Sequence, residues 1–279
     1  MPRSRAFAQV DVFSSEPYLG NPVAVVLDAE GLETDAMHRL ARWTNLSETT
    51  FVLSPSTPDA DYRLRIFTPG GELPFAGHPT LGSAHAWLEA GGVPKKDRIV
   101  QECGAGLVEL RRTNGVLAFA APPTLRSGPL DDEYLQRIAS AFGIARDRIV
   151  DHQWVDNGPG WAVVLLATAD EVLALEPDLA QIPDAKIGAV GAYPEGGSYA
   201  FEIRAFAPGV GVPEDPVTGS LNASVAQWLT GTGRAQAPYR VSQGARLGRA
   251  GEIRIDRDPD DTVWVGGATT TFFSGTAVL

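Results

Sequence analysis

The chain has 279 residues, 44% hydrophobic and 20% charged, a balance typical of a packed protein with one large domain or two ordinary ones. Its net charge of −11 and estimated pI of about 4.8 argue against a surface that binds nucleic acid or an anionic membrane. No apolar run is long enough to cross a bilayer, and the N-terminal segment lacks the apolar core of a secretory signal, so we expect a cytoplasmic protein.

The first half of the chain is predicted to contain a strand, a helix, two further strands, a second helix and a β-hairpin. Apolar patterns and turn residues place these elements near residues 23–28, 35–45, 50–53, 65–70, 79–90 and 106–120. The hairpin is indicated by alternating apolar and polar residues on either side of Asn114-Gly115.

The second half follows a boundary that we place near residue 125. Residues 122–134 contain three prolines and a glycine, which is typical of a turn between structural units. We therefore expect two domains, 1–125 and 126–279, of which the second can return its last strand to the first. A helix ending at Gly143 precedes a strand, a weaker helical segment, another strand, a helix after Pro216 and a final hairpin.

The two halves share ordered sequence similarity, which indicates a duplicated unit. "RIFTPGGELPFAGHPTLGSA" begins at Arg65, and "RAFAPGVGVPEDPVTGSLNA" begins 139 residues later at Arg204. "AVVL" occurs at 24–27 and again at 162–165, an offset of 138. A shorter loop in the second copy aligns Pro79 with Pro216.

Each copy contains a helix that is predicted to begin at this proline, because proline is tolerated at the first helical position. His78 and Asp215 then fall at or near the N-caps. Both helices are apolar nearly all round, so we expect each to be buried inside a curled sheet. If the halves face each other, the free N–H groups of the two first turns converge on a cleft and can hold a carboxylate.

Each polar residue near these helices also has a purely structural interpretation. Asp215 can simply cap its helix, and a lone histidine such as His78 is more often structural than catalytic. Ser83 and Ser220 lie where serine is common for local hydrogen bonding. Glu48, in "NLSETTFVL", lies just before a strand, where a glutamate is often an ordinary edge residue.

Five ordered motifs give the chain a resemblance to a known family that covers nearly its whole length. They are "DVFSSEPYLGNPVAVVLDAEGL", "NLSETTFVL", "RIFTPGGELPFAGHPTLGSAHAWL", "GVPEDPVTGSLNASVAQWL" and "SQGARLGRAGEIRI". The sequence resembles the PhzF-type isomerases of the phenazine-biosynthesis group, which share the fold of diaminopimelate epimerase and proline racemase. The resemblance implies an α+β fold of two pseudo-symmetric halves, each a curled, mostly antiparallel sheet or barrel around a central helix.

The resemblance also implies roles for individual residues. The glutamate of the "LSET" motif, the proton-carrying acid/base of the family, corresponds to Glu48. The glycine and histidine of "GHP" correspond to Gly77 and His78. The aspartate and serine of the second helix motif correspond to Asp215 and Ser220.

The sequence departs from the related racemases, which place one cysteine at the start of each central helix. Neither matching segment contains a thiol, and the single cysteine, Cys103, lies in a hairpin. A two-thiol mechanism is therefore excluded, as are an internal disulfide and a cysteine-based zinc site. The four histidines have no metal-ligand spacing, so we expect no metal and no cofactor.

The expected activity is a cofactor-independent isomerisation or epimerisation of a small carboxylate-bearing substrate, with Glu48 as the acid/base and His78 and Asp215 assisting. The helix starts at Gly77-His78-Pro79 and Thr218-Gly219-Ser220 would hold the substrate carboxylate.

Two alternatives remain open. The first alternative to an isomerase is a non-catalytic protein that binds a small metabolite on the same fold. The second, which the sequence favours less because it lacks a GxSxG elbow, is a serine hydrolase built from Ser220, His78 and Asp215. The resemblance further implies a possible homodimer.

Overall fold

In the computed structural model, which describes residues 3–279, the segment up to Ala120 forms eight strands and two helices. These are β1 (Ser4–Val12), β2 (Asn21–Val26), α1 (Thr34–Thr44), β3 (Glu48–Leu53), β4 (Tyr62–Phe67), β5 (Glu72–Leu73), α2 (Gly77–Glu89), β6 (Ile99–Cys103), β7 (Gly106–Thr113) and β8 (Val116–Ala120). The rest of the chain forms β9 (Arg126–Gly128), α3 (Asp132–Phe142), β10 (Asp151–Asp156), β11 (Ala162–Leu166), α4 (Ala169–Leu173), β12 (Ile187–Ala192), β13 (Phe201–Ala207), β14 (Val212–Asp215), α5 (Gly219–Gly231), β15 (Tyr239–Gln243), β16 (Gly251–Arg257), β17 (Val263–Gly267) and β18 (Thr269–Val278).

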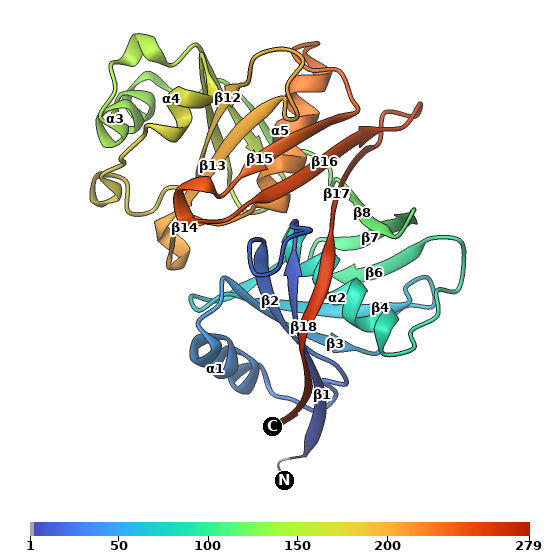
Figure 1. Ribbon diagram of the computed structural model, residues 1–279. Helices are drawn as coiled ribbons and strands as arrows, with labels where there is room; N and C mark the ends of the chain where they lie inside the picture. The colour runs from blue at the N-terminus through green and yellow to red at the C-terminus, as the bar shows by residue number, and fades with distance from the viewer. Residues whose placement is uncertain (1–2) are drawn as a thin grey trace.

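The two halves have the same sheet topology. In the first, seven strands pair in the order β1-β2-β3-β4-β6-β7-β8, and the β2–β3 and β4–β6 pairs are parallel. In the second, the order is β10-β11-β12-β13-β15-β16-β17, with parallel pairs at the same two places. Figure 1 shows the resulting lobes, one curled around α2 and the other around α5. The predicted fold of two similar halves is confirmed.

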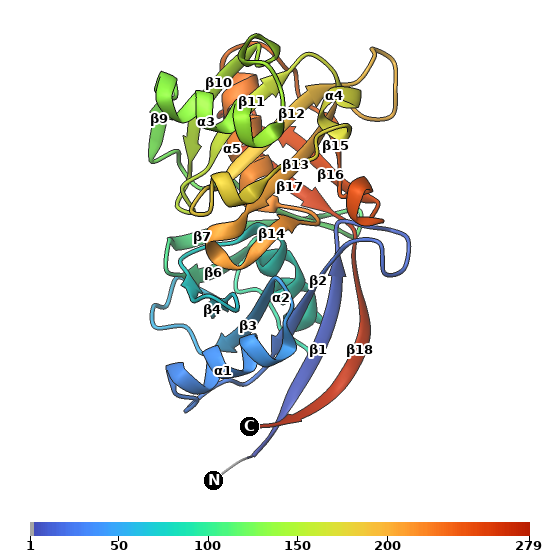
Figure 2. The same ribbon diagram turned by 90° about the vertical axis from the view of Figure 1, so that its left-hand side faces the viewer.

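Two strand pairings join the lobes. β8 pairs with β17, so the sheet of one lobe continues into the sheet of the other. β18 pairs along the whole length of β1, which places the C-terminal strand in the first lobe. Figure 2 shows β1 and β18 side by side, with both chain ends at the far end of that lobe. The lobes are therefore tied together on both sides of their junction.

Helices α2 and α5 are buried because small and apolar residues cover almost all of their surfaces. In α2 the residues from Gly77 to Ala84 are all buried, and α5 is buried over most of its length. Small residues let the surrounding strands approach closely. A Cβ added to Gly82 of α2 would lie 2.3 Å from a methyl group of Val23 on β2.

The start of the second central helix differs from the prediction. α5 begins at Gly219 with Thr218 as its N-cap, so the prediction that Pro216 begins the helix is wrong. Asp215 is the last residue of β14 and accepts no backbone hydrogen bond from α5. It does not cap the helix. In α2, Pro79 is the third helical residue and Ala76 is the N-cap, so the prediction that Pro79 begins this helix is also wrong. The two helix starts pair Gly77 with Gly219, and the sequence alignment of Pro79 with Pro216 therefore does not hold in the structure.

Two predicted turns and one predicted helix lie outside the central helices. The hairpin turn at Asn114-Gly115 and the end of α3 at Gly143 are confirmed, and all three residues have positive φ. The weak helical segment at 170–182 is reduced to α4 and one 3-10 turn at Leu179–Gln181. Pro177 lies between them and cannot continue the helix.

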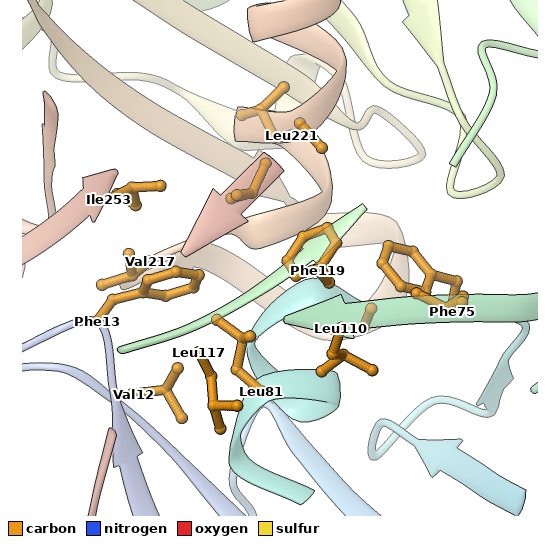
Figure 3. Close-up of a cluster of buried hydrophobic side chains, with 14 of the residues drawn as sticks. Val12, Phe13, Phe75, Leu81, Leu110, Leu117, Phe119, Val217, Leu221 and Ile253 are labelled. Carbon is orange, nitrogen blue, oxygen red and sulfur yellow. The ribbon is translucent and has the colours of Figure 1, made fainter. Parts of the chain in front are cut away.

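The main hydrophobic core extends through both lobes and across their junction. Figure 3 shows Leu81 of α2 and Leu221 of α5 on either side of Phe119, which β8 contributes. Phe75 packs edge-on against Phe119, with ring centroids 5.4 Å apart. Since this core is shared, the two central helices are held in a fixed relation to each other. Within residues 3–279, no helix is long and apolar enough to span a membrane.

Candidate active site

A pocket lies between the lobes, at the point where the N-termini of α2 and α5 meet. It contains about 530 Å³ of empty space, part of which opens to solvent. Its wall is formed by Glu48, Leu73, Phe75, Ala76, Gly77, His78, Pro159, Trp161, Lys186, Ala207, Val210, Val212, Asp215, Thr218, Gly219 and Ser220.

The two helix N-termini touch through glycine. A Cβ added to Gly77 would lie 2.6 Å from Cα of Gly219, and one added to Gly219 would lie 2.7 Å from Cα of Gly77. Only glycine permits this approach. The first-turn amides of both helices therefore point into one region, and their partial positive charges add there.

Glu48 is the first residue of β3 and is buried in the pocket wall, with 9% of its surface exposed. Burial raises its pKa well above the usual value, and the negative charge of Asp215 raises it further. Its Oε2 has no hydrogen-bond partner among the described residues. A buried carboxyl oxygen without a partner is uncommon in folded proteins, and in the wall of a pocket it leaves an acceptor free for a ligand.

His78 lies next to Glu48, as the second residue of α2. Its Nε2 is 3.3 Å from Oε2 of Glu48, without the geometry of a hydrogen bond. Burial lowers the pKa of His78 to about 3, so the ring is neutral at neutral pH and the contact is not an ion pair. Its Nδ1 lies 3.2 Å from the amide nitrogen of Asn21. When Nδ1 accepts that hydrogen bond, the ring proton is on Nε2 and faces Glu48.

Asp215 is buried in the second lobe, and its negative charge raises the pKa of Glu48. Its Oδ1 accepts a 2.9 Å hydrogen bond from Asn21 and its Oδ2 a 2.6 Å bond from Thr218. Burial raises its pKa to about 6, although these hydrogen bonds oppose the shift. The pocket thus contains two carboxyl groups whose environments both favour the protonated form.

Of two further residues predicted to bind substrate, Thr218 lines the pocket and Pro79 does not. Thr218 lines it, but its N–H donates to Gln243 and its hydroxyl is hydrogen bonded to Asp215 and Gln243. Thr218 therefore supports Asp215 and has no free donor for a ligand. Pro79 is buried in α2 and is not part of the wall.

Ser220 lies on the wall, and its Oγ accepts a 3.0 Å hydrogen bond from the indole N–H of Trp161. Because this bond occupies an acceptor position of Oγ, the hydroxyl proton is available to a ligand. No hydrogen bond joins Ser220 to His78 in the described part of the chain, so a serine–histidine–aspartate relay is not formed.

Sequence reasoning missed four residues of the site. Asn21 links His78 to Asp215 across the lobes, and Gln243 holds the loop before α5. Trp161 positions Ser220, and Lys186 brings a positive charge to the wall. Asn21 and Gln243 lie inside two of the five quoted motifs, but the sequence assigned them no role, and Trp161 directly precedes "AVVL" at 162–165.

The described residues contain no group of three or more histidine, cysteine, aspartate or glutamate side chains that could hold a metal ion. The pocket wall contains two carboxyl groups, a neutral imidazole, a serine, a lysine and two helix N-termini. Such a set can move a proton and hold an anionic group.

Comparison with known proteins extends these observations. A family model for phenazine biosynthesis-like proteins matches residues 10–275. Antisense-enhancing sequence 1 of Schizosaccharomyces pombe is 38% identical, and the match covers 98% of this chain and 99% of the relative. Trans-2,3-dihydro-3-hydroxyanthranilate isomerase of Pseudomonas fluorescens is 36% identical, with coverage of 97% and 98%.

Solved structures give the same fold. A PhzF-family phenazine biosynthesis protein of Bacillus anthracis superimposes with a TM-score of 0.81 at 22% identity, covering 99% of this chain and all of that one. A probable proline racemase of Agrobacterium radiobacter gives a TM-score of 0.63 at 15% identity, with coverage of 99% and 93%. These two likenesses establish the epimerase-like architecture of the two lobes.

Proposed function

The chain belongs to the family of phenazine biosynthesis-like proteins and is an isomerase, and we propose that it moves a proton within a small carboxylate-bearing substrate by means of Glu48. One observation carries this proposal. The buried carboxyl group of Glu48 has an unpartnered oxygen and lies in a pocket bounded by two helix N-termini.

Substrate binding comes first in the proposed reaction. The amides of Gly77, His78, Gly219 and Ser220 belong to first turns, where a helix has no internal acceptors for them. Two such turns in contact can hold a carboxylate without an arginine. The apolar wall formed by Phe75 and its neighbours excludes water from the rest of the substrate.

Proton transfer then depends on Glu48. As a carboxylate it takes a proton from a carbon next to an activating group of the substrate, and as a carboxylic acid it returns the proton to another carbon. A general base works best when its pKa lies near the working pH, and burial moves the pKa of Glu48 in that direction. The helix N-termini stabilise the negative charge that develops on the substrate meanwhile.

His78 and Asp215 assist the proton transfer, but neither takes the proton from the substrate. The neutral imidazole of His78 lies 3.3 Å from Glu48 and can direct its carboxyl group or bind a polar substrate group. Asp215 holds Asn21 and raises the pKa of Glu48 through its charge. Both are proposed as assisting residues.

The proposal is tested by the uptake of solvent deuterium. A panel of small cyclic and amino acids, including trans-2,3-dihydro-3-hydroxyanthranilate, is incubated with the protein in D2O and followed by NMR. We expect exchange or isomerisation in at least one compound and a loss of at least about 100-fold in Glu48→Gln, because general acid–base groups contribute that much.

The matched control is Glu202→Gln, since Glu202 is also a buried glutamate with a raised pKa but lies outside the pocket wall. It should keep wild-type exchange. Exchange at the wild-type rate in Glu48→Gln would remove Glu48 from the mechanism.

A further inference from the structure

Because the fold is duplicated, the second lobe has a residue at the position equivalent to Glu48. In the parallel pair of the first lobe, Ala24 lies opposite Thr49. In the corresponding pair of the second lobe, Ala162 lies opposite Ile187. Both residues of the second pair lie 138 positions after those of the first. The residue before Thr49 is Glu48, and the residue before Ile187 is Lys186, so the repeat places Lys186 where the other lobe has Glu48.

Lys186 lines the same pocket as Glu48, as expected for two equivalent positions in lobes that face each other. Its side chain is half-buried and lines the wall beside Trp161 and Pro159. Its Nζ donates a 2.5 Å hydrogen bond to the carbonyl of Pro159. An ammonium group has three N–H donors, so two remain for other partners. Within residues 3–279, Lys186 forms no ion pair with a carboxylate.

Lys186 is also the only basic side chain on the described wall apart from His78, which is neutral at neutral pH. About half of the other wall residues have apolar side chains, among them Phe75, Trp161, Val210 and Val212. A half-buried cation in such a setting gains much from an anionic partner, because few other groups there can replace its hydration.

We propose that Lys186 is a specificity-determining residue that binds a second anionic group of the substrate, distinct from the carboxylate held at the helix N-termini. This inference rests on the proposed function and names the substrate class as small dianionic acids, with dicarboxylates as the simplest members. The same wall also contains apolar side chains, including Phe75 and Trp161, which suit the hydrocarbon part of such a molecule.

The acidic groups that face the same space do not prevent dianion binding. Burial raises the pKa of both Glu48 and Asp215, which favours their protonated forms.

The inference is tested by binding, without turnover. Benzoate and the three benzenedicarboxylates, which place a second carboxylate at three positions on one ring, are titrated by NMR. For the wild type we expect at least one dicarboxylate to bind roughly 10-fold or more tightly than benzoate, as is typical of a charge-assisted hydrogen bond. Lys186→Met should lose this preference and keep its affinity for benzoate, whereas Lys186→Arg should retain the preference.

The control variant is Lys95→Met. Lys95 also donates to backbone carbonyls, those of Pro58 and Ala60, but lies away from the pocket. It should keep the dicarboxylate preference. If Lys186→Met keeps the preference, if benzoate binding falls equally with it, or if the wild type shows no preference, the assignment is wrong.

Failure of this inference can be distinguished from failure of the proposed function. The dicarboxylate preference should persist in Glu48→Gln, because that variant keeps Lys186 and both helix N-termini. A protein that keeps the preference but shows no role for Glu48 in deuterium exchange would contradict only the proposed function. The reverse result would contradict only the role of Lys186.

Discussion

The two lobes have the same frame but present different side chains to the pocket. Gly77 and Gly219 occupy equivalent helix starts, and both remain glycine because the helices touch there. Next to them, His78 stands in one lobe and Ser220 in the other. At the start of the equivalent strands, Glu48 is matched by Lys186. Positions that set the backbone are therefore the same in both lobes, whereas positions that carry chemistry differ.

This difference gives a pocket with two unlike sides. One side holds a buried acid and a neutral imidazole, which suit proton transfer. The other holds a lysine and a serine whose hydroxyl is positioned by Trp161, which suit recognition of an anion. Asp215 and Asn21 connect the sides, since Asn21 of the first lobe donates to Asp215 of the second. Duplication has supplied the frame, and divergence at a few wall positions has supplied the chemistry.

The largest expected effect on stability is the pH dependence that comes from Asp215, which Asn21 contacts from the other lobe. Its pKa is raised from 3.8 to about 6 in the folded protein, so folding takes up a proton between these values. The resulting stabilisation is fully present below pH 3.8 and is lost as pH rises through 6. Relative to Asp215→Asn, the wild type should lose on the order of 3 kcal/mol of unfolding free energy between pH 4 and pH 7.

Urea unfolding of both proteins across this pH range measures the difference. Asp132→Asn, a change at an exposed aspartate in the first turn of α3, provides the control and should shift stability by less than about 0.5 kcal/mol. A difference between wild type and Asp215→Asn that is constant from pH 4 to pH 7 would show that the carboxyl group of Asp215 is not held as described.

The contact between the helix starts can be broken from either side. Gly77→Ala or Gly219→Ala places a methyl group within 2.7 Å of the opposing backbone, which cannot move aside without separating the helices. Each change should cost about 1–3 kcal/mol of stability by overpacking, and should weaken benzoate binding because the two first turns move apart. Thermal unfolding and NMR titration measure both effects.

Gly231→Ala at the other end of α5 is the matched control, because an added Cβ meets open space there. The double variant sharpens the test. Once one methyl group has separated the helices, the second costs less, so the combined loss should be smaller than the sum of the single losses. Full additivity would mean that the two glycines do not share one contact.

Sequence patterns predicted most of the frame because its signals are local. The Asn114-Gly115 turn, the apolar helices and the repeated strand motifs each follow from a few neighbouring residues. The start of α5 was predicted wrongly because Asp-Pro is also a common helix start. Here Asp215 continues β14 instead, and its side chain is held by Asn21 from the other lobe. That contact spans 194 residues and has no local signal.

The site was predicted in part for the same reason. Glu48, His78 and Asp215 lie in recognisable motifs, and the structure brings all three into one pocket wall. Trp161 and Gln243 act through contacts with the segment around α5. Trp161 lies in none of the quoted motifs, and the motif that contains Gln243 does not indicate what it contacts. Lys186 could have been found by applying the offset of the "AVVL" repeat to Glu48, since the offset of 138 is preserved in the strand register.

The smallest expected effect tests how the anion-recognising side is ordered. Trp161→Phe keeps an aromatic ring in the wall but removes the 3.0 Å hydrogen bond to Ser220. The hydroxyl can then rotate away from the ligand, so benzoate affinity should fall by roughly 3–10-fold, with a stability loss of about 1 kcal/mol.

Ser220→Ala, which leaves the buried indole N–H unpaired, should cost about 1–3 kcal/mol of stability and a similar loss of affinity. If the indole acts through the hydroxyl, Trp161→Phe has no further effect on affinity when Ser220 is already alanine. An unchanged loss in the double variant would show that Trp161 contributes only its ring surface. The unlike character of the two sides would then depend on Lys186 alone.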